Sequence, residues 1–434
     1  MSEIAIIICV SIFFSLIVHF PFFKSVNKKS NIFPVHQFNS KSLSLLIILN
    51  LILLLSVLNL ILTQINFVIY LSLAFLVLLI FFNFRNFTFE RDLFINLFIF
   101  FVVVFILAID IAHNLTFYWD TQKIWYPKAL LFFKDGLISD LRDTAYPHYS
   151  FFGSLLWAFF WNISNIENEY MGRIFYLVIF CFSIKNFINL TYLKSDKKII
   201  SFLFLILLIY DYWLFRGTQE ILVFSFLLIC FNNLFKIICE NKSNWKNLLI
   251  VFLSLNLLIW TKNEGIILSF VILSILIVFI KSNANYKVLL TLIFFLLIFV
   301  RFFVYKLYGI DTSLSKDFDF RNLPYHFLNN LNFNNLIIIS KYVFVSFLKF
   351  PHIFLSLLCA LMLAKNKVIL KKYIFLYIYL ISTIFLLFLT YLSSDNEINF
   401  MVSTGSLRLM FEFSSPYLFF ILIYLRYKLK KFKF

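Results

Sequence analysis

Charged residues are scarce in this chain. Only 14% of its 434 residues are Asp, Glu, Lys or Arg, and 62% are hydrophobic, whereas a soluble domain is typically about half apolar and a quarter charged. Glycine and proline are also rare, with seven of each, so the apolar residues predict helices rather than short strands. The five cysteines lack CxxC spacing and indicate neither a metal site nor a disulfide. These deficits exclude a soluble enzyme, a disordered chain and a disulfide scaffold.

Apolar runs long enough to cross a bilayer, roughly 20 residues each, recur from end to end, and the mean hydropathy is +0.93. They predict an all-α, polytopic integral membrane bundle of about thirteen transmembrane helices. The first run carries Glu3 and no basic segment before it, which predicts a retained helix rather than a cleaved signal. The expected spans are 3–20, 42–63, 66–83, 92–111, 171–192, 199–215, 219–238, 247–262, 265–281, 287–308, 344–364, 373–392 and 416–429.

The net charge of +17 comes from Lys and Arg clustered mostly between apolar runs. Cytoplasmic loops of membrane proteins carry such an excess, so the charge predicts orientation and not nucleic-acid binding. The loops expected inside are 21–41, 84–91, 193–198, 239–246, 282–286, 365–372 and the C-terminus. Those expected outside are 112–170, 216–218, 262–264, 309–343 and 393–415. The chain is thereby divided into N-terminal spans (1–111), a first outer loop (112–170), central spans (171–308), a second large outer loop (309–343) and C-terminal spans (344–434).

The apolar segment 149–163 is the one exception to this scheme. If it crossed the membrane, every later basic loop would lie outside, and it is short for a crossing. Its Tyr149, Trp157 and Trp161 favour a helix at the outer membrane interface, where amphipathic rings collect.

Most unusual polar residues lie in the expected outer loops, and charges near membrane depth are functional candidates. Asp120 lies in the aromatic stretch 117–130, where Pro127 predicts the start of a short helix that Gly136 ends. A low dielectric there would raise the carboxyl pKa toward that of a general base. The alternative is a solvated loop in which Asp120 pairs with Lys123.

Other outer turns carry ionisable residues with two interpretations each. His148 follows a Tyr-Pro turn and is a capping or packing residue as readily as a catalyst. Glu220 begins a helix, where the macrodipole alone favours its charge. Lys262 beside Glu264 is either a site cation or a lysine whose stem covers apolar surface.

Arg408 lies just before the last expected span. Its planar fork suits phosphate oxygens, although it could instead pair with Glu412 four residues on. The outer loops together hold carboxylates, cations and aromatic rings. Transfer of a group from a lipid-linked phosphate requires such a set, because a carboxylate takes the acceptor's proton and cations or a bound metal stabilise the leaving phosphate.

Short motifs occur in a fixed order between about residues 117 and 416. They are Trp119-Asp120, Trp125-Tyr126-Pro127-Lys128-Ala129, Tyr146-Pro147, Arg173, Gly217 with Glu220, Lys262-Asn263-Glu264-Gly265, and Ser403, Ser406 and Arg408 before Pro416. In this series the chain resembles polytopic GT-C fold glycosyltransferases, especially bacterial relatives of the dolichyl-phosphate-mannose protein mannosyltransferases. It departs from them in having four expected spans before Asp120 instead of one, and Glu220 where many have Asp.

The resemblance implies a GT-C-like bundle with juxtamembrane helices in the first outer loop. It implies inverting transfer of a sugar from a polyprenyl-phosphate-linked donor to a glycan, lipid or protein acceptor, on the outer face of the bacterial cytoplasmic membrane. Asp120 is the expected general base, and Glu220 and Glu264 would orient substrate. Glu220 would hold a divalent Mg or Mn ion if one is used. The expected substrate-binding residues are Lys262 and Arg408 at the donor phosphate, with Lys123, Trp125, Lys128 and His148.

Two other functions fit the same residues. A transporter or flippase for a lipid-linked glycan would bind cargo with these charges without chemistry. Such proteins commonly show inverted repeats and broken helices, and the sequence predicts neither. A structural subunit of an envelope assembly would have no catalytic residue.

Overall fold

The computed structural model describes residues 3–19, 35–58, 91–164, 168–191, 195–240, 244–311, 322–394 and 396–431, and within these ranges it is all-helical with no strand. The first half contains α1 (Glu3–His19), α2 (Val35–Val57), α4 (Arg91–His113), the π-helical turn η1 (Thr121–Trp125), α5 (Tyr126–Phe133), the 3-10 turn η2 (Ile138–Asp143), α6 (Phe152–Ser164), α7 (Tyr170–Ile188), α8 (Ser195–Ile209) and the 3-10 turn η3 (Tyr212–Phe215).

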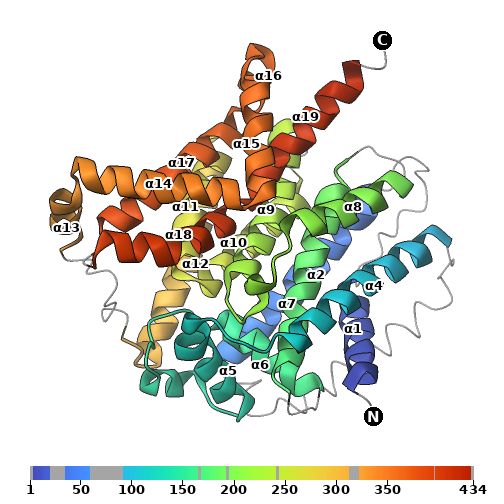
Figure 1. Cartoon of the computed structure of the whole chain (residues 1–434), viewed down its shortest axis with the longest axis vertical. Helices are drawn as coiled ribbons and strands as arrows, with labels where there is room; N and C mark the ends of the chain where they lie inside the picture. Colours follow the sequence, from blue (N-terminus) through green and yellow to red (C-terminus); the bar gives the residue numbers. More distant parts are fainter. Residues whose placement is uncertain are drawn as a thin grey trace.

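The second half begins at the buried helix α9. It contains α9 (Glu220–Cys239), α10 (Trp245–Thr261), α11 (Asn263–Phe279), α12 (Ala284–Leu307), α13 (Leu323–Asn330), α14 (Phe333–Lys349), α15 (Pro351–Ala364), α16 (Lys367–Lys372), α17 (Ile374–Leu392), α18 (Ile398–Phe413), the 3-10 turn η4 (Ser415–Tyr417) and α19 (Leu418–Lys431). Figure 1 shows α9 and α10 between the early helices, drawn blue to green, and the late ones, drawn orange to red.

Several helices could cross a membrane, as the composition predicts. In the described part of the chain, α4 from Phe94, α7, α9, α12 and α17 are long and apolar enough, and two bent pairs, α13–α14 and α18–α19, bring the total to seven if each pair is one span. Five shorter apolar helices, among them α10 and α11, fall below that length. The expected count of thirteen is therefore not confirmed, and the expected span 66–83 lies outside the described residues.

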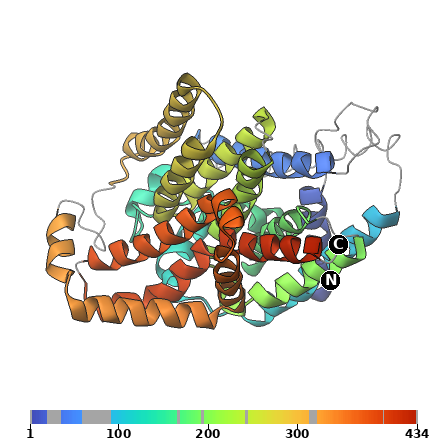
Figure 2. The same ribbon diagram turned by 90° about the horizontal axis from the view of Figure 1, so that it is seen from above.

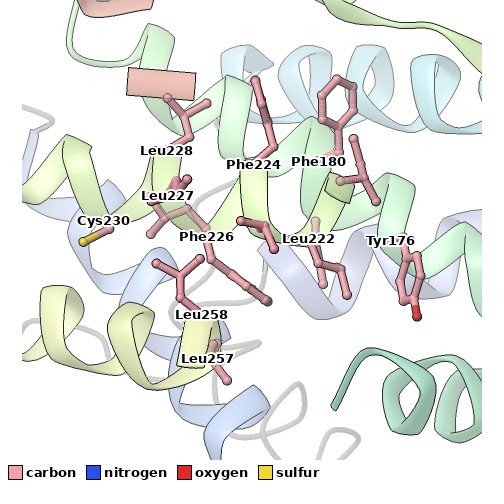
Figure 3. Packing of buried hydrophobic residues seen from close by; sticks show 14 of the residues in the cluster. Tyr176, Phe180, Leu222, Phe224, Phe226, Leu227, Leu228, Cys230, Leu257 and Leu258 are labelled. Carbon is pink, nitrogen blue, oxygen red and sulfur yellow. The ribbon is translucent and has the colours of Figure 1, made fainter. Parts of the chain in front are cut away.

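Helices α7 and α9 form the centre of the bundle. About 94% of each is buried, against 28% of α4 and α12. Figure 3 shows Leu222 and Phe224 of α9 packed in one cluster with Phe180 of α7 and Leu258 of α10. Between helices in a membrane such contacts stabilise through van der Waals packing and not through removal of apolar surface from water. This packing fixes α9, and with it Glu220 at its first turn.

Two segments expected as outer loops contain helices. The region 309–343 includes α13 and most of α14, and the region 393–415 includes α18; α14 and α18 lie side by side in both views (Figures 1 and 2). The polar residues at 403–406 led to the prediction of a loop where the structure has α18. Its hydroxyls are satisfied inside the helix, since Ser403 and Thr404 both donate to the Phe400 carbonyl at 2.9 Å.

The expected span 344–364 is divided between two helices. Helix α14 ends at Lys349, and α15 starts at Pro351, which has no backbone N–H to continue the preceding helix. Helix α14 also starts earlier than expected, at Phe333, where the Asn332 side chain caps it.

The apolar segment 149–163 does form a helix, α6, but Trp157 and Trp161 are buried in the protein and not exposed as the rings of an aromatic belt would be. Every residue from Phe152 to Trp161 is buried in the protein. Trp157 is fully enclosed, and its indole N–H donates to the Glu169 carbonyl at 2.8 Å. The reason is packing of α6 between α5 and α7, with Gly172 of α7 allowing the Trp157 backbone to approach closely.

The short helix expected after Pro127 is present as α5, with the proline in its first turn. The expected terminator differs by one residue. Asp135, not Gly136, has the left-handed φ of 62°, while the Gly136 N–H donates back to the Leu131 carbonyl at 2.9 Å.

Candidate functional site

Four segments far apart in the sequence meet at one cluster of charged side chains. Asp120 immediately precedes η1, and Glu220 is the first residue of α9. Lys262 is the single residue between α10 and α11, and its backbone is extended. Arg408 and Glu412 lie one turn apart on α18. The expected outer segments 112–170, 216–218, 262–264 and 393–415 thus come together, and we call these five residues with Glu264 the ion-pair cluster.

Arg408 links the first outer loop to α9. Its guanidinium donates to the Asp120 carboxylate, and its Nε lies 3.0 Å from Glu220 Oε1. The Arg408 and Asp120 side chains are 18% and 21% exposed, whereas Glu220 is 1% exposed. The guanidinium also lies over the Tyr118 ring at 5.3 Å. Arg408 and Asp120, together with Glu264, which is 30% exposed, are therefore the members of the cluster that a substrate can reach.

Lys262 is enclosed by three carboxylates. Its Nζ donates to Glu412 and, at 3.2 Å, to Glu220 Oε1, and it lies 3.8 Å from Glu264 Oε1. The lysine side chain is 3% exposed and Glu412 is fully buried. Lys262 therefore joins α9, α18 and the α10–α11 turn, and it is not the lysine at an apolar surface of the alternative interpretation.

The turn that carries Lys262 is held by hydrogen bonds from α12. Arg301 of α12 donates to the Ile259 carbonyl and to the Asn263 side-chain oxygen. Gly265 makes the tight reversal possible, because a Cβ there would lie 2.0 Å from the Leu258 carbonyl oxygen.

The turn before α9 holds the Asp120 loop in place. The Tyr118 N–H donates to the Arg216 carbonyl at 3.4 Å. Gly217 has a φ of 81°, and a Cβ on it would lie 2.4 Å from Thr121 Cγ2. Arg173 of α7 supports the same turn, since it donates to the Phe215 carbonyl at 2.7 Å and pairs with Glu169 through two hydrogen bonds.

The ion-pair cluster has more carboxyl groups than cations. In the described part of the chain, Asp120, Glu220, Glu264 and Glu412 form ion pairs only with Lys262 and Arg408. Among the described residues, one oxygen each of Glu220, Glu264 and Glu412 is buried and has no hydrogen-bond partner. Buried polar atoms normally have partners, so these oxygens are candidate acceptors for donors on a substrate.

The arrangement does not fit a metal ion at Glu220. Within the described ranges, no group of three or more His, Cys, Asp and Glu side chains is arranged to hold one. The carboxylates converge on the Lys262 ammonium, and Glu220 Oε1 already pairs with both cations. We therefore assign no step to a metal.

The other residues expected to bind substrate lie around the first outer loop. Lys123 is exposed and forms no ion pair in the part of the chain that the structure describes; Asp120 pairs with Arg408 instead. Trp125 is buried against Tyr149, and His148 is buried beside the same ring. Lys128 is fully buried and donates to the Tyr149 carbonyl. Burial and nearby Arg301 hold the Lys128 pKa well below its ordinary value.

The sequence reasoning missed the role of Glu412. Glu412 was expected only as an alternative partner of Arg408. In the structure Glu412 pairs with Lys262, 150 residues earlier. A signal was available, because Glu412 lies between Phe411 and Phe413 next to the last apolar run, and charges in apolar segments are functional candidates.

Comparison of the chain with protein-family models, with curated proteins and with solved structures finds no match.

Proposed function

We propose that this membrane protein transfers a sugar from a polyprenyl-phosphate-linked donor to an acceptor hydroxyl on the outer face of the membrane. One observation carries the proposal. Asp120, Glu220, Lys262 and Arg408, which the sequence singled out from separate loops, belong to one ion-pair cluster. A base, a phosphate-binding cation and buried acceptors are the groups that such a transfer uses.

In this proposal Asp120 is the general base and Arg408 binds the donor phosphate. The two now pair with one another at the accessible side of the cluster. The donor is a phosphodiester with one negative charge; when its oxygens take over the Arg408 fork they release Asp120, so that donor binding itself prepares the base. Lys262 is enclosed and serves as a positioning residue that holds Glu220 and Glu412.

The chemical step is an inverting displacement. The acceptor oxygen bonds to the anomeric carbon while the bond from that carbon to the phosphate oxygen breaks. The acceptor's proton passes to Asp120, and the electron pair of the broken bond leaves with the phosphate at Arg408. Glu264, which is 30% exposed, accepts hydrogen bonds from sugar hydroxyls, and Glu220 orients Arg408.

The decisive experiment is Asp120→Asn in purified full-length protein. Asparagine keeps the size but cannot take the proton, and general-base catalysis contributes typically 10²–10⁴-fold, so we expect turnover with a panel of lipid-linked sugars to fall at least about a hundredfold. Asp143→Asn is the matched control, because Asp143 is 78% exposed in the same loop and should be neutral. Near-normal transfer by Asp120→Asn would remove the catalytic assignment.

A flippase for a lipid-linked glycan is the second candidate, because one observation favours it. Helices α18 and α19 form an apolar pair bent by 47° around η4, and transporters place binding sites at broken helices. Arg408 and Glu412 lie in the last two turns before this bend. Wild-type protein that moves a fluorescent lipid-linked glycan across vesicles without transferring its sugar would select this function.

A further inference from the structure

A second polar site lies at the end of α4 that leads into the Asp120 loop. It is a groove of about 490 Å³ lined by Ile106, Leu107, Asp110, Asn114, Tyr210 and Asp211. Ile106, Leu107 and Asp110 lie on α4, Asn114 directly follows it, and Tyr210 and Asp211 directly follow α8.

The groove changes from apolar to polar along α4. Ile106, at 58% exposure, and Leu107 lie one turn below Asp110, and Asn114 lies one turn above it. Most of α4 is not covered by protein, so the apolar end is continuous with a surface that faces lipid if α4 spans the membrane. A molecule with an apolar tail and a polar head matches this order.

The polar end selects the kind of head group. The Asp110 carboxylate accepts hydrogen bonds from Tyr210 and, at 3.0 Å, from Asn114. In the described ranges neither Asp110 nor Asp211 forms an ion pair with Lys, Arg or His. Two carboxylates without a cation attract hydroxyl or ammonium donors and repel a phosphate. The groove is therefore unsuited to the polyprenyl-phosphate donor.

A continuous set of contacts joins the groove to the candidate base. The Tyr210 ring stacks on Phe215 at 5.3 Å. The next residue, Arg216, accepts a backbone hydrogen bond from Tyr118, two residues before Asp120. A head group in the groove would thus lie alongside the loop that carries the base.

We infer that this groove binds the acceptor, and that the acceptor is a lipid with a neutral or cationic head group bearing hydroxyls. The assignment of this lipid as the acceptor rests on the proposed function, but lipid binding to the groove can be measured without turnover. It narrows the substrate class to a membrane lipid rather than a soluble glycan or a protein.

The test measures lipid binding to full-length protein in phosphatidylcholine nanodiscs. The probes are monoglucosyl diacylglycerol, which is neutral, and phosphatidylglycerol, which is anionic, with methyl glucoside as the soluble head group alone. We expect the neutral glycolipid to bind at least about tenfold more tightly than the other two, since one charge-assisted hydrogen bond or one tail contact is worth that factor. Equal binding of the two lipids, or equal binding of methyl glucoside, would overturn the inference.

Two variants locate the binding. Asp211→Asn removes a carboxylate without an ion pair and should weaken glycolipid binding about tenfold while improving that of phosphatidylglycerol. Leu107→Trp should block the apolar end and weaken both. Asp196→Asn, in the first turn of α8 at its opposite end, is the matched control and should bind as wild type. Wild-type affinity in both groove variants would refute the site.

Asp120→Asn separates the two proposals. It should bind the glycolipid as wild type does, because Asp120 does not line the groove. If the binding pattern holds but wild type transfers no sugar, the lipid site stands and the transferase proposal fails. If transfer depends on Asp120 but the groove variants keep normal glycolipid affinity, only the acceptor inference fails.

Discussion

Replacing Lys262 with methionine tests the ion-pair cluster most directly. The change keeps the apolar stem and removes the ammonium that Glu412, Glu220 and Glu264 share. Glu220 keeps Arg408 as a partner at 3.0 Å, but Glu412 is fully buried and pairs only with Lys262 among the described residues. The variant therefore leaves one buried carboxylate uncompensated.

The expected loss can be worked from this geometry. At 3.2 Å and an effective dielectric constant of 20, one pair is worth about 5 kcal/mol before desolvation. Removing one partner of a buried pair typically costs about 3–5 kcal/mol. We expect the free energy of unfolding of Lys262→Met to fall by that amount, measured by reversible unfolding in mixed micelles.

Two further variants show whether the loss comes from the orphaned carboxylate. Lys246→Met changes an exposed lysine at the other end of α10 and should be nearly neutral. Adding Glu412→Gln to Lys262→Met should restore more than about 1 kcal/mol, because it removes the unpaired charge. A loss below about 1 kcal/mol in Lys262→Met, or a double variant less stable than the single one, would refute the reasoning.

Three further predictions follow from neighbouring contacts. Arg408→Lys keeps the charge and loses the fork, so binding of a polyprenyl-phosphate sugar should weaken tenfold to a hundredfold, about 1.5–3 kcal/mol; unchanged donor affinity would make Arg408 purely structural. Gly217→Ala should destabilise more than Gly309→Ala, because both have left-handed φ but only Gly217 meets Thr121 and Trp157; equal melting temperatures would contradict this. Lys128 has a depressed pKa, so the unfolded chain binds more protons than the folded one between that pKa and 10.5, and stability should rise by up to about 1.4 kcal/mol per pH unit there. Lys128→Met should lose this rise in unfolding titrations, and an unchanged slope would count against the assignment.

The sequence predicted the helical class because hydropathy and low glycine and proline content are sums over many residues. It also predicted α5, because Pro127 is a local signal for a helix start. The structure of 393–415 could not be predicted in the same way. Its Ser and Thr hydroxyls resemble a loop in composition, and only their bonds to the Phe400 carbonyl show that they are helical.

The candidate site was predicted residue by residue but not in its pairing. The sequence suggested Lys123 as the ion-pair partner of Asp120, three residues away, and Glu412 as that of Arg408, four residues away. The observed pairs are 288 and 150 residues apart. Local spacing cannot show such pairs, because they depend on how α9, α10 and α18 pack. The burial of the α6 rings could not be predicted either, because it depends on the packing of α6 between α5 and α7.

The wide sequence separation within the ion-pair cluster has a consequence for biosynthesis. Glu220 begins α9 and Lys262 directly follows the next helix, α10, so they can pair as soon as that hairpin is made. Glu412 follows Lys262 by 150 residues, about 8–30 s later at ribosomal rates of 5–20 residues per second. During that interval Lys262 has only Glu220 and Glu264, and Glu220 lacks its guanidinium. Arrival of α18 then joins this late helix to the loop that carries Asp120, so the nascent protein cannot complete its charge pairing before residue 412 has been synthesised.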